Sequence, residues 1–129
     1  MSIKINISVE ADHILVTANG VYKHFDALEL MRMAIGVATR EKIPKILIDV
    51  RKIVGEISTM ERYDLAVLIS QLVQQQTGIP FIKIAMVGNK PIIDANRFGE
   101  TVAVNRGVQG IATTDLNEAL KWLGVNQSI

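Results

Sequence analysis

The chain has 129 residues, of which 49% are hydrophobic, and its 14 basic and 13 acidic residues leave a formal net charge of +1. A chain of this size can bury one sizeable core but not two, and it lacks the basic excess of a nucleic-acid-binding protein. Cysteine is absent, which excludes disulfides, thiolate nucleophiles and zinc–thiolate sites.

The N-terminal stretch alternates apolar and polar residues and lacks the continuous apolar segment of a signal peptide. No apolar run approaches the roughly 18–20 residues that a membrane span requires. We therefore expect a cytoplasmic protein without a membrane span.

Residues 2–18 predict a β-hairpin. Apolar residues alternate with polar ones in its first strand, so one face is expected to be buried: Ile3, Ile5, Ile7 and Val9. A short connection leads to a second β-rich run over residues 13–18, which Asn19–Gly20 is expected to end. Since the first strand has one polar face, it is typical of an edge or antiparallel strand.

A helix is predicted over residues 25–40, where apolar residues recur at helical spacing. The continuous apolar run at residues 46–48 then predicts a central strand over residues 45–50, covered on both faces. The apolar run stops at Asp49, and we expect a short loop that carries Arg51 and Glu56 to follow the strand.

The second half of the chain alternates helical and strand patterns. The predicted elements are a helix over 59–76, a strand over 81–87, a helix over 95–106 capped by Asp94, a strand over 108–112 and a last helix capped at Thr114 or Asp115. The inward positions expected in the third helix are Phe98, Val102 and Asn105.

The predicted order is β-β-α-β-α-β-α-β-α. Because strands and helices alternate after the hairpin, the strands should be parallel and joined by right-handed crossovers. The expected architecture is an α/β fold with four helices and a mixed five-stranded sheet. It should form one domain over residues 1–125, with a frayed tail at 126–129.

This order, and the strand–loop–helix stretch at residues 45–69, resemble the STAS domain, the fold of bacterial anti-sigma factor antagonists. The segment TDLNEALKWL at 114–123 is similar to the closing helix of the wider SpoIIAA-like group. The segments at 55–63 and 96–107 resemble small uncharacterised bacterial proteins of that group. The resemblance implies a non-enzymatic regulatory domain that binds another protein, such as a kinase that is also an anti-sigma factor.

In antagonist STAS domains, a strand that ends in aspartate leads to an Asp-Ser-Ser/Thr-Gly loop, and the partner kinase phosphorylates its serine. Asp49 matches the strand-terminal aspartate, and Ser58 or Thr59 lies where the phosphorylated serine would be. Ile57 replaces the loop aspartate and Met60 replaces the glycine. The resemblance therefore implies Ser58 and Thr59 as candidate phosphorylation or anion sites.

Ser58 also has a purely structural interpretation. With Glu61 it forms the S-x-x-E pattern of a capping box, in which each side chain binds the other residue's backbone N–H. The same helix N-terminus favours a phosphate group. The sequence leaves both interpretations open.

Further polar residues are expected at the carboxyl edge of the sheet and along the third helix. The candidate interaction surface consists of Asp49, Arg51, Glu56, Arg62, Asn89, Arg97, Glu100, Thr101, Asn105 and Arg106. An exposed ion pair at the edge and a solvated helix face explain these residues as well as a partner-facing stripe does. We expect neither a metal site nor a cofactor, because the sequence lacks nucleotide-binding, metal-ligand and serine-hydrolase motifs.

Two further possibilities concern apolar surface. The superfold resembles lipid carriers of the Sec14 type, so an apolar ligand or lipid is the alternative function. The residues expected to line such a pocket are Leu30, Met31, Met33 and Val37 beside Leu68, Leu72 and Val73. An exposed first strand or an apolar helix face also makes a homodimer plausible.

Overall fold

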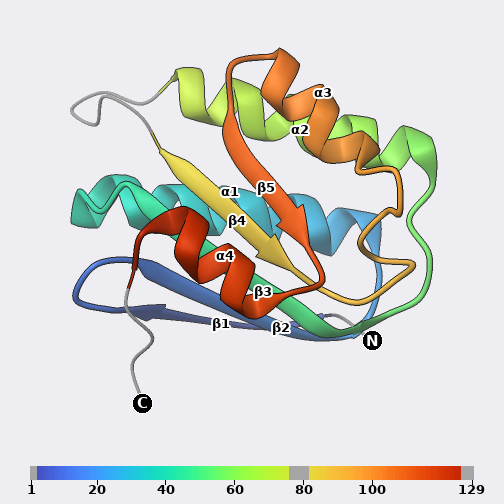
Figure 1. Ribbon diagram of the computed structural model, residues 1–129, viewed down its shortest axis with the longest axis horizontal. Helices are drawn as coiled ribbons and strands as arrows, with labels where there is room; N and C mark the ends of the chain where they lie inside the picture. Colours follow the sequence, from blue (N-terminus) through green and yellow to red (C-terminus); the bar gives the residue numbers. More distant parts are fainter. Residues whose placement is uncertain (1–2, 76–81, 126–129) are drawn as a thin grey trace.

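The computed structural model describes residues 3–75 and 82–125, which form one five-stranded sheet in the order β1-β2-β3-β4-β5 (Figure 1). The first pair is antiparallel and the other three are parallel. The elements are β1 Lys4–Val9, β2 Ile14–Val21, α1 His24–Glu41, β3 Lys45–Val54, α2 Thr59–Gln74, β4 Lys83–Val87, α3 Phe98–Asn105, β5 Gln109–Thr113 and α4 Leu116–Leu123. The predicted fold class and element order are confirmed.

Some predictions concern parts of the chain outside the described residues. They are the frayed tail at 126–129 and the junction between the second helix and the fourth strand at 76–81. Within the described residues, no helix is long and apolar enough to cross a membrane.

The helices cover the two faces of the sheet unequally (Figure 1). The larger core joins the sheet to α1, α2 and α3, and it includes Ile46 and Ile48 of β3. The smaller core lies beneath α4 and includes Leu47 of β3 with Ala119 and Leu123 of the helix. Successive residues of β3 thus enter opposite cores, which confirms that this strand is central and buried on both faces.

β3 is longer than its sequence pattern predicts. It continues to Val54, so the prediction that the strand ends at Val50 and that a loop carries Arg51 is wrong. The physical reason is that β2 also continues, to Val21 instead of ending at residues 19–20, and provides the ladder partner. Beyond Asp49 the register shifts by one residue, so Val50 and Arg51 together face one residue of β2 and form a β-bulge.

The first strand is buried less completely than predicted. Ile5 and Ile7 are half-buried against the larger core, as expected, but Val9 is 47% exposed. Val9 lies beside the hairpin turn, on a strand that has only one neighbour in the sheet.

α3 begins three residues later than predicted. Arg97 has the left-handed φ of 53°, which is incompatible with a helix running through it, so the first helical residue is Phe98. Asp94 still caps the helix, because its Oδ2 accepts a hydrogen bond from the Phe98 N–H at 2.9 Å. The inward face differs in part from the prediction: Ala103 is buried and Val102 packs against the larger core, whereas Phe98 and Asn105 are exposed.

Candidate functional site

The start of α2 is closed by the predicted capping box. Ser58 Oγ accepts a hydrogen bond from the Glu61 N–H at 3.1 Å, and Glu61 Oε1 accepts one from the Ser58 N–H at 2.9 Å. The backbone N–H of Ser58 lowers the pKa of the Glu61 carboxyl below its ordinary value. Ser58 and Thr59 are both exposed, so an enzyme could reach either hydroxyl.

The most exposed large apolar side chains of the described residues all lie where α1 and α2 begin. They are between 60% and 72% exposed: Val21, Phe25, Val54 and Met60. Val21 and Val54 are paired at the ends of β2 and β3, while Phe25 and Met60 belong to the first turns of the two helices. We call these four residues, with Ser58, the helix-start border. Exposed apolar side chains concentrated in one region are typical of interaction sites.

A hydrogen-bonded chain ties the two helix starts together. The Tyr22 hydroxyl lies 2.7 Å from His24 Nδ1, and His24 Nε2 lies 3.3 Å from Asp64 Oδ2. An imidazole protonated on Nε2 satisfies both contacts. Burial, and then the negative charge of Glu61, raise the pKa of the Tyr22 hydroxyl. Phe25 follows His24 and Met60 lies one helical turn before Asp64, so these hydrogen bonds link the two first turns that carry the exposed side chains.

Asp49, Arg51 and Asn89 lie together, as predicted. Arg51 Nε and Nη2 donate to the two carboxylate oxygens of Asp49 at 2.9 and 2.8 Å. Asn89 Nδ2 donates to the Arg51 carbonyl at 3.1 Å. Burial acts to raise the pKa of Asp49, but the hydrogen bonds and charge of Arg51 outweigh it, so the pKa lies below its ordinary value. The carboxylate is held in a bidentate ion pair, which is a structural role.

The predicted residues of α3 mostly attach this helix to its neighbours. Glu100 Oε1 accepts a hydrogen bond from the Ala112 N–H of β5 at 2.7 Å. Arg97 lies 3.8 Å from Glu100 and 3.7 Å from Glu118 of α4. Arg106 donates to the Tyr63 hydroxyl of α2 at 2.8 Å. No hydrogen bond or ion pair among the described residues joins these side chains to Asp49 or Arg51, and whether they form one binding surface stays a prediction.

The remaining candidates are placed separately. Thr101 Oγ1 donates to the Arg97 carbonyl at 3.0 Å, within the helix. Arg62 donates to the carbonyls of residues 91 and 92 at 2.6 and 2.7 Å, which anchors the loop after β4 to α2. Glu56 and Asn105 are exposed.

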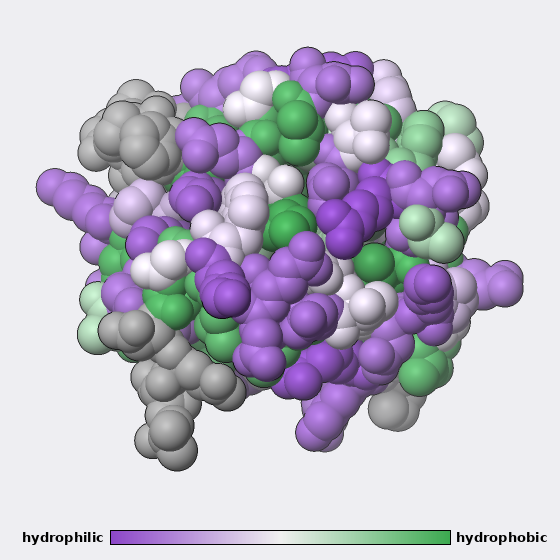
Figure 2. All heavy atoms as spheres, in the orientation of Figure 1, coloured by the Kyte–Doolittle hydropathy of each residue, from purple (hydrophilic) through white to green (hydrophobic). Residues whose placement is uncertain are grey.

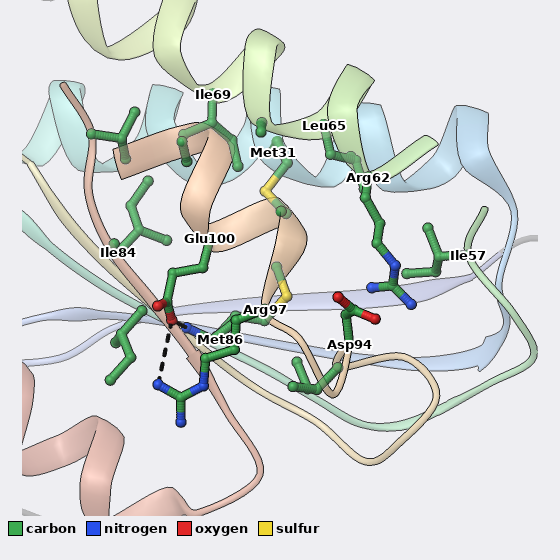
Figure 3. A pocket seen from close by; sticks show the side chains of 18 of the residues that line it. Met31, Ile57, Arg62, Leu65, Ile69, Ile84, Met86, Asp94, Arg97 and Glu100 are labelled. Carbon is green, nitrogen blue, oxygen red and sulfur yellow. Dashed lines mark hydrogen bonds and ion pairs between the residues drawn. The ribbon is translucent and has the colours of Figure 1, made fainter. Parts of the chain in front are cut away.

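An apolar cavity of about 100 Å³ lies between α2, α3, β4 and β5 (Figure 3). Its apolar wall includes Met31, Leu65, Ile69, Ile84 and Met86, and its charged lining residues are Arg62, Asp94, Arg97 and Glu100. A second cavity of about 50 Å³ shares Met31, Leu65 and Met86 with the first.

The predicted pocket between the first two helices is displaced. Of its seven expected residues, Met31 lines both cavities and Leu30 lines the smaller one. The other five line neither cavity: Met33, Val37, Leu68, Leu72 and Val73. Most of these side chains pack against the core and fill the seam between the helices, while Met33 is 45% exposed. The described residues also contain no group of three or more His, Cys, Asp or Glu side chains that could hold a metal ion.

The surface of the face that carries α4 is largely hydrophilic, with small apolar areas between the polar side chains (Figure 2).

Two solved structures share this fold. An anti-sigma factor antagonist from Mycobacterium paratuberculosis aligns with a TM-score of 0.61 and 15% identity, over 95% of each chain. An uncharacterised protein of the DUF3478 family with a SpoIIAA-like fold, from Shewanella loihica PV-4, aligns with a TM-score of 0.55 and 20% identity, over 95% of this chain and 94% of that one. The sequence matches no protein-family model and no curated protein. The predicted resemblance is thus confirmed as a likeness of fold.

Proposed function

We propose that this chain is a non-enzymatic, cytoplasmic regulatory domain that binds another protein through the helix-start border. One observation carries the proposal: the four most exposed large apolar side chains of the described residues all lie at this border. Leaving them in water is unfavourable, and a partner that covers them would gain the corresponding hydrophobic free energy. The SpoIIAA-like fold, which an anti-sigma factor antagonist shares, supports the same class of function.

Ser58 is the proposed regulatory position within this border. A phosphate would add about −1.5 to −2 charges at neutral pH, at the positive end of α2. It would also repel the Glu61 carboxylate, which binds the Ser58 N–H in the unmodified chain. Phosphorylation would therefore open the capping box and place negative charge beside Met60, which changes the surface that the partner meets.

Affinity purification with a double variant tests the border. Phe25→Ser/Met60→Ser should lose a partner that the wild-type chain retains from extracts of the source cells. Val104→Ser is a matched control, because Val104 is 49% exposed but lies on α3. The captured protein is then purified and titrated against all three chains. Equal binding by all three would contradict the proposal, as would binding to lipid vesicles in place of a protein.

The regulatory step has its own test. The purified chain is incubated with the captured partner and ATP if that partner is a kinase, and the product is analysed by intact mass and peptide mapping. We expect one phosphate on Ser58 and weaker binding by the modified chain. Modification at another residue, or no modification, would contradict the proposed phosphorylation of Ser58. It would not contradict the proposed binding surface.

The apolar cavity favours a second function, the binding of a small apolar ligand or lipid. Its wall is almost entirely aliphatic, and charged side chains line one part of it (Figure 3). Native mass spectrometry and lipid extraction of the purified protein provide the test. A co-purifying small molecule would support a carrier function, whereas an empty protein that takes up no apolar dye would contradict it.

A further inference from the structure

The two edge strands of the sheet differ in how their outer backbone groups are occupied. β5 pairs with β4 on one side, and on its other side the Ala112 N–H donates to Glu100 of α3. β1 pairs with β2 on one side only. Among residues 3–75 and 82–125, no strand pairs with the outer side of β1, and α1 reaches only the residue before it, where Asp26 accepts the Ile3 N–H. An unprotected edge of this kind is a template for another strand.

The hairpin turn determines which backbone groups of β1 point outward. Glu10 N–H donates to the His13 carbonyl at 2.9 Å, so Glu10 faces β2. Because orientation alternates along an antiparallel ladder, every second residue before Glu10 also faces β2. The residues that face outward are Ile5, Ile7 and Val9. Ile3 agrees with this assignment, since its N–H bonds the Asp26 side chain and not β2.

The segment KINISVE consists of β1 and the residue after it. Its residue types are arranged symmetrically about Ile7, and its two ends carry opposite charges. Antiparallel pairing with a copy of itself about a twofold axis at Ile7 would match each residue with one of similar or opposite chemistry. The matched pairs are Lys4 with Glu10, Ile5 with Val9, Asn6 with Ser8, and Ile7 with itself. The central residue faces outward, so the two copies of Ile7 would exchange a reciprocal pair of N–H···O bonds.

We propose that the partner of this edge is a second copy of the chain, and that the two β1 strands join in this register. Charge complementarity selects the register, because no other antiparallel alignment places Lys4 opposite Glu10. The Lys4 side chain is exposed, and the Glu10 carboxylate lies beside the Ser8 hydroxyl on the same face of the strand. The pairing would also bring Val9, which is 47% exposed, against Ile5 of the copy. A twofold axis makes the contact isologous and closed, so it yields a dimer and not a fibre.

Charge reversal tests the register directly. Lys4→Glu and Glu10→Lys each replace two attractive pairs across the axis by two repulsive ones, and each should weaken self-association by at least about tenfold. An equimolar mixture of the two variants should recover it, because a chain with two glutamates then faces a chain with two lysines. Lys121→Glu, an exposed charge on α4, is the control and should associate like the wild type.

The measurement is sedimentation velocity over a range of concentrations, with thermal unfolding of each variant to confirm that it is folded. A chain that stays monomeric at every concentration overturns the proposal. So does a dimer that both charge variants leave intact, since it must form through another surface. Failure of the mixture to associate, when each variant is folded, overturns the register.

A cross-link provides a second test that does not depend on charge. The chain has no cysteine, so Asn6→Cys and Ser8→Cys can each carry a single thiol. These positions would face each other as a non-hydrogen-bonded pair with Cα atoms about 4.5 Å apart, within the range of a disulfide. Oxidation of the mixed variants with diamide should give the mixed disulfide as the main dimer. A predominance of either homodimer would overturn the register.

Discussion

The two edge strands of this sheet, β5 and β1, differ in whether their outward backbone groups have hydrogen-bond partners. At β5, one carboxylate from a neighbouring helix accepts the outward N–H of Ala112. At β1, the outward groups of three residues have no partner among the described residues, and the strand contains neither a proline nor a bulge. One N–H of the β5 edge is therefore occupied within the chain, whereas the outward groups of β1 are left available for another strand.

The difference follows from topology. The connection from β4 to β5 passes through α3, whose Glu100 can reach the last strand. The connection from β1 to β2 is a tight hairpin, closed by the bond from Glu10 to His13, and the helix after β2 reaches only the residue before β1, where Asp26 of α1 accepts the Ile3 N–H. At β5 the helix carboxylate accepts an N–H within the strand, whereas at β1 it accepts only the N–H of the residue before the strand.

The largest expected effect on the free energy of unfolding comes from a proline substitution, made in turn at each of the two edge strands. Ala112→Pro removes the N–H that Glu100 accepts and should lower the free energy of unfolding by about 2–3 kcal/mol. Val9→Pro removes an N–H that takes no part in the β1–β2 ladder and should cost less than about 1 kcal/mol in the monomer. Urea unfolding at low protein concentration measures both. Equal losses would mean that the two edges do not differ.

Glu100 can be changed in two steps. Glu100→Ala leaves the Ala112 N–H without its acceptor and should cost about 1–2 kcal/mol. Glu100→Gln keeps a carbonyl oxygen at the same place and should lose less than half as much. Urea unfolding, with hydrogen exchange at the Ala112 amide, measures both variants. If alanine and glutamine behave alike, the hydrogen bond is not what protects this edge.

Ser58 does for α2 what Glu100 does for β5, because it accepts an otherwise unpaired backbone N–H. Ser58→Ala should therefore lower the free energy of unfolding by about 1 kcal/mol. Ser58→Asp keeps a cap and should stay closer to the wild type. Thermal and urea unfolding of the three chains provide the comparison; an alanine variant as stable as the wild type would show that the cap does not contribute.

The smallest effect is expected at Asp49, on a strand between the two edges. Its folded-state pKa is lowered, so ionisation of Asp49 stabilises the fold above its ordinary pKa of about 3.9 and loses this effect as the pH falls through the lowered value. Asp49→Asn should cost about 0.5 kcal/mol at pH 7, the scale of an exposed ion pair. The difference should shrink below about pH 4. A difference that is constant down to pH 2 would exclude the ion pair as its cause.

Local patterns predicted much of the fold. The alternation in β1 as far as Ile7, the continuous apolar run in β3 and the capping box at Ser58 each depend on neighbours in sequence, and each is confirmed. Asp115 caps α4 and Gly124 ends it at a φ of 71°, for the same reason. Such features are decided within a few residues, before any tertiary contact forms.

The features that the sequence did not predict depend on residues distant in the chain. β3 continues past Asp49 only because β2 supplies a ladder there, and no local pattern reveals that partner. The contact from Glu100 to Ala112 joins residues of different elements across a turn. The exposure of Phe25 and Met60 is equally invisible in sequence, because apolar residues in a first helical turn are usually expected to pack inward.

Hydrogen exchange of individual backbone amides in the wild-type chain tests the difference between the two edges most directly. At low concentration the amide of Ala112 should be protected, and those of Ile5, Ile7 and Val9 should exchange rapidly. As the concentration rises, these three amides should become protected together, while Ala112 stays unchanged. Protection of the three amides that does not depend on concentration, or rapid exchange at Ala112, would contradict the account.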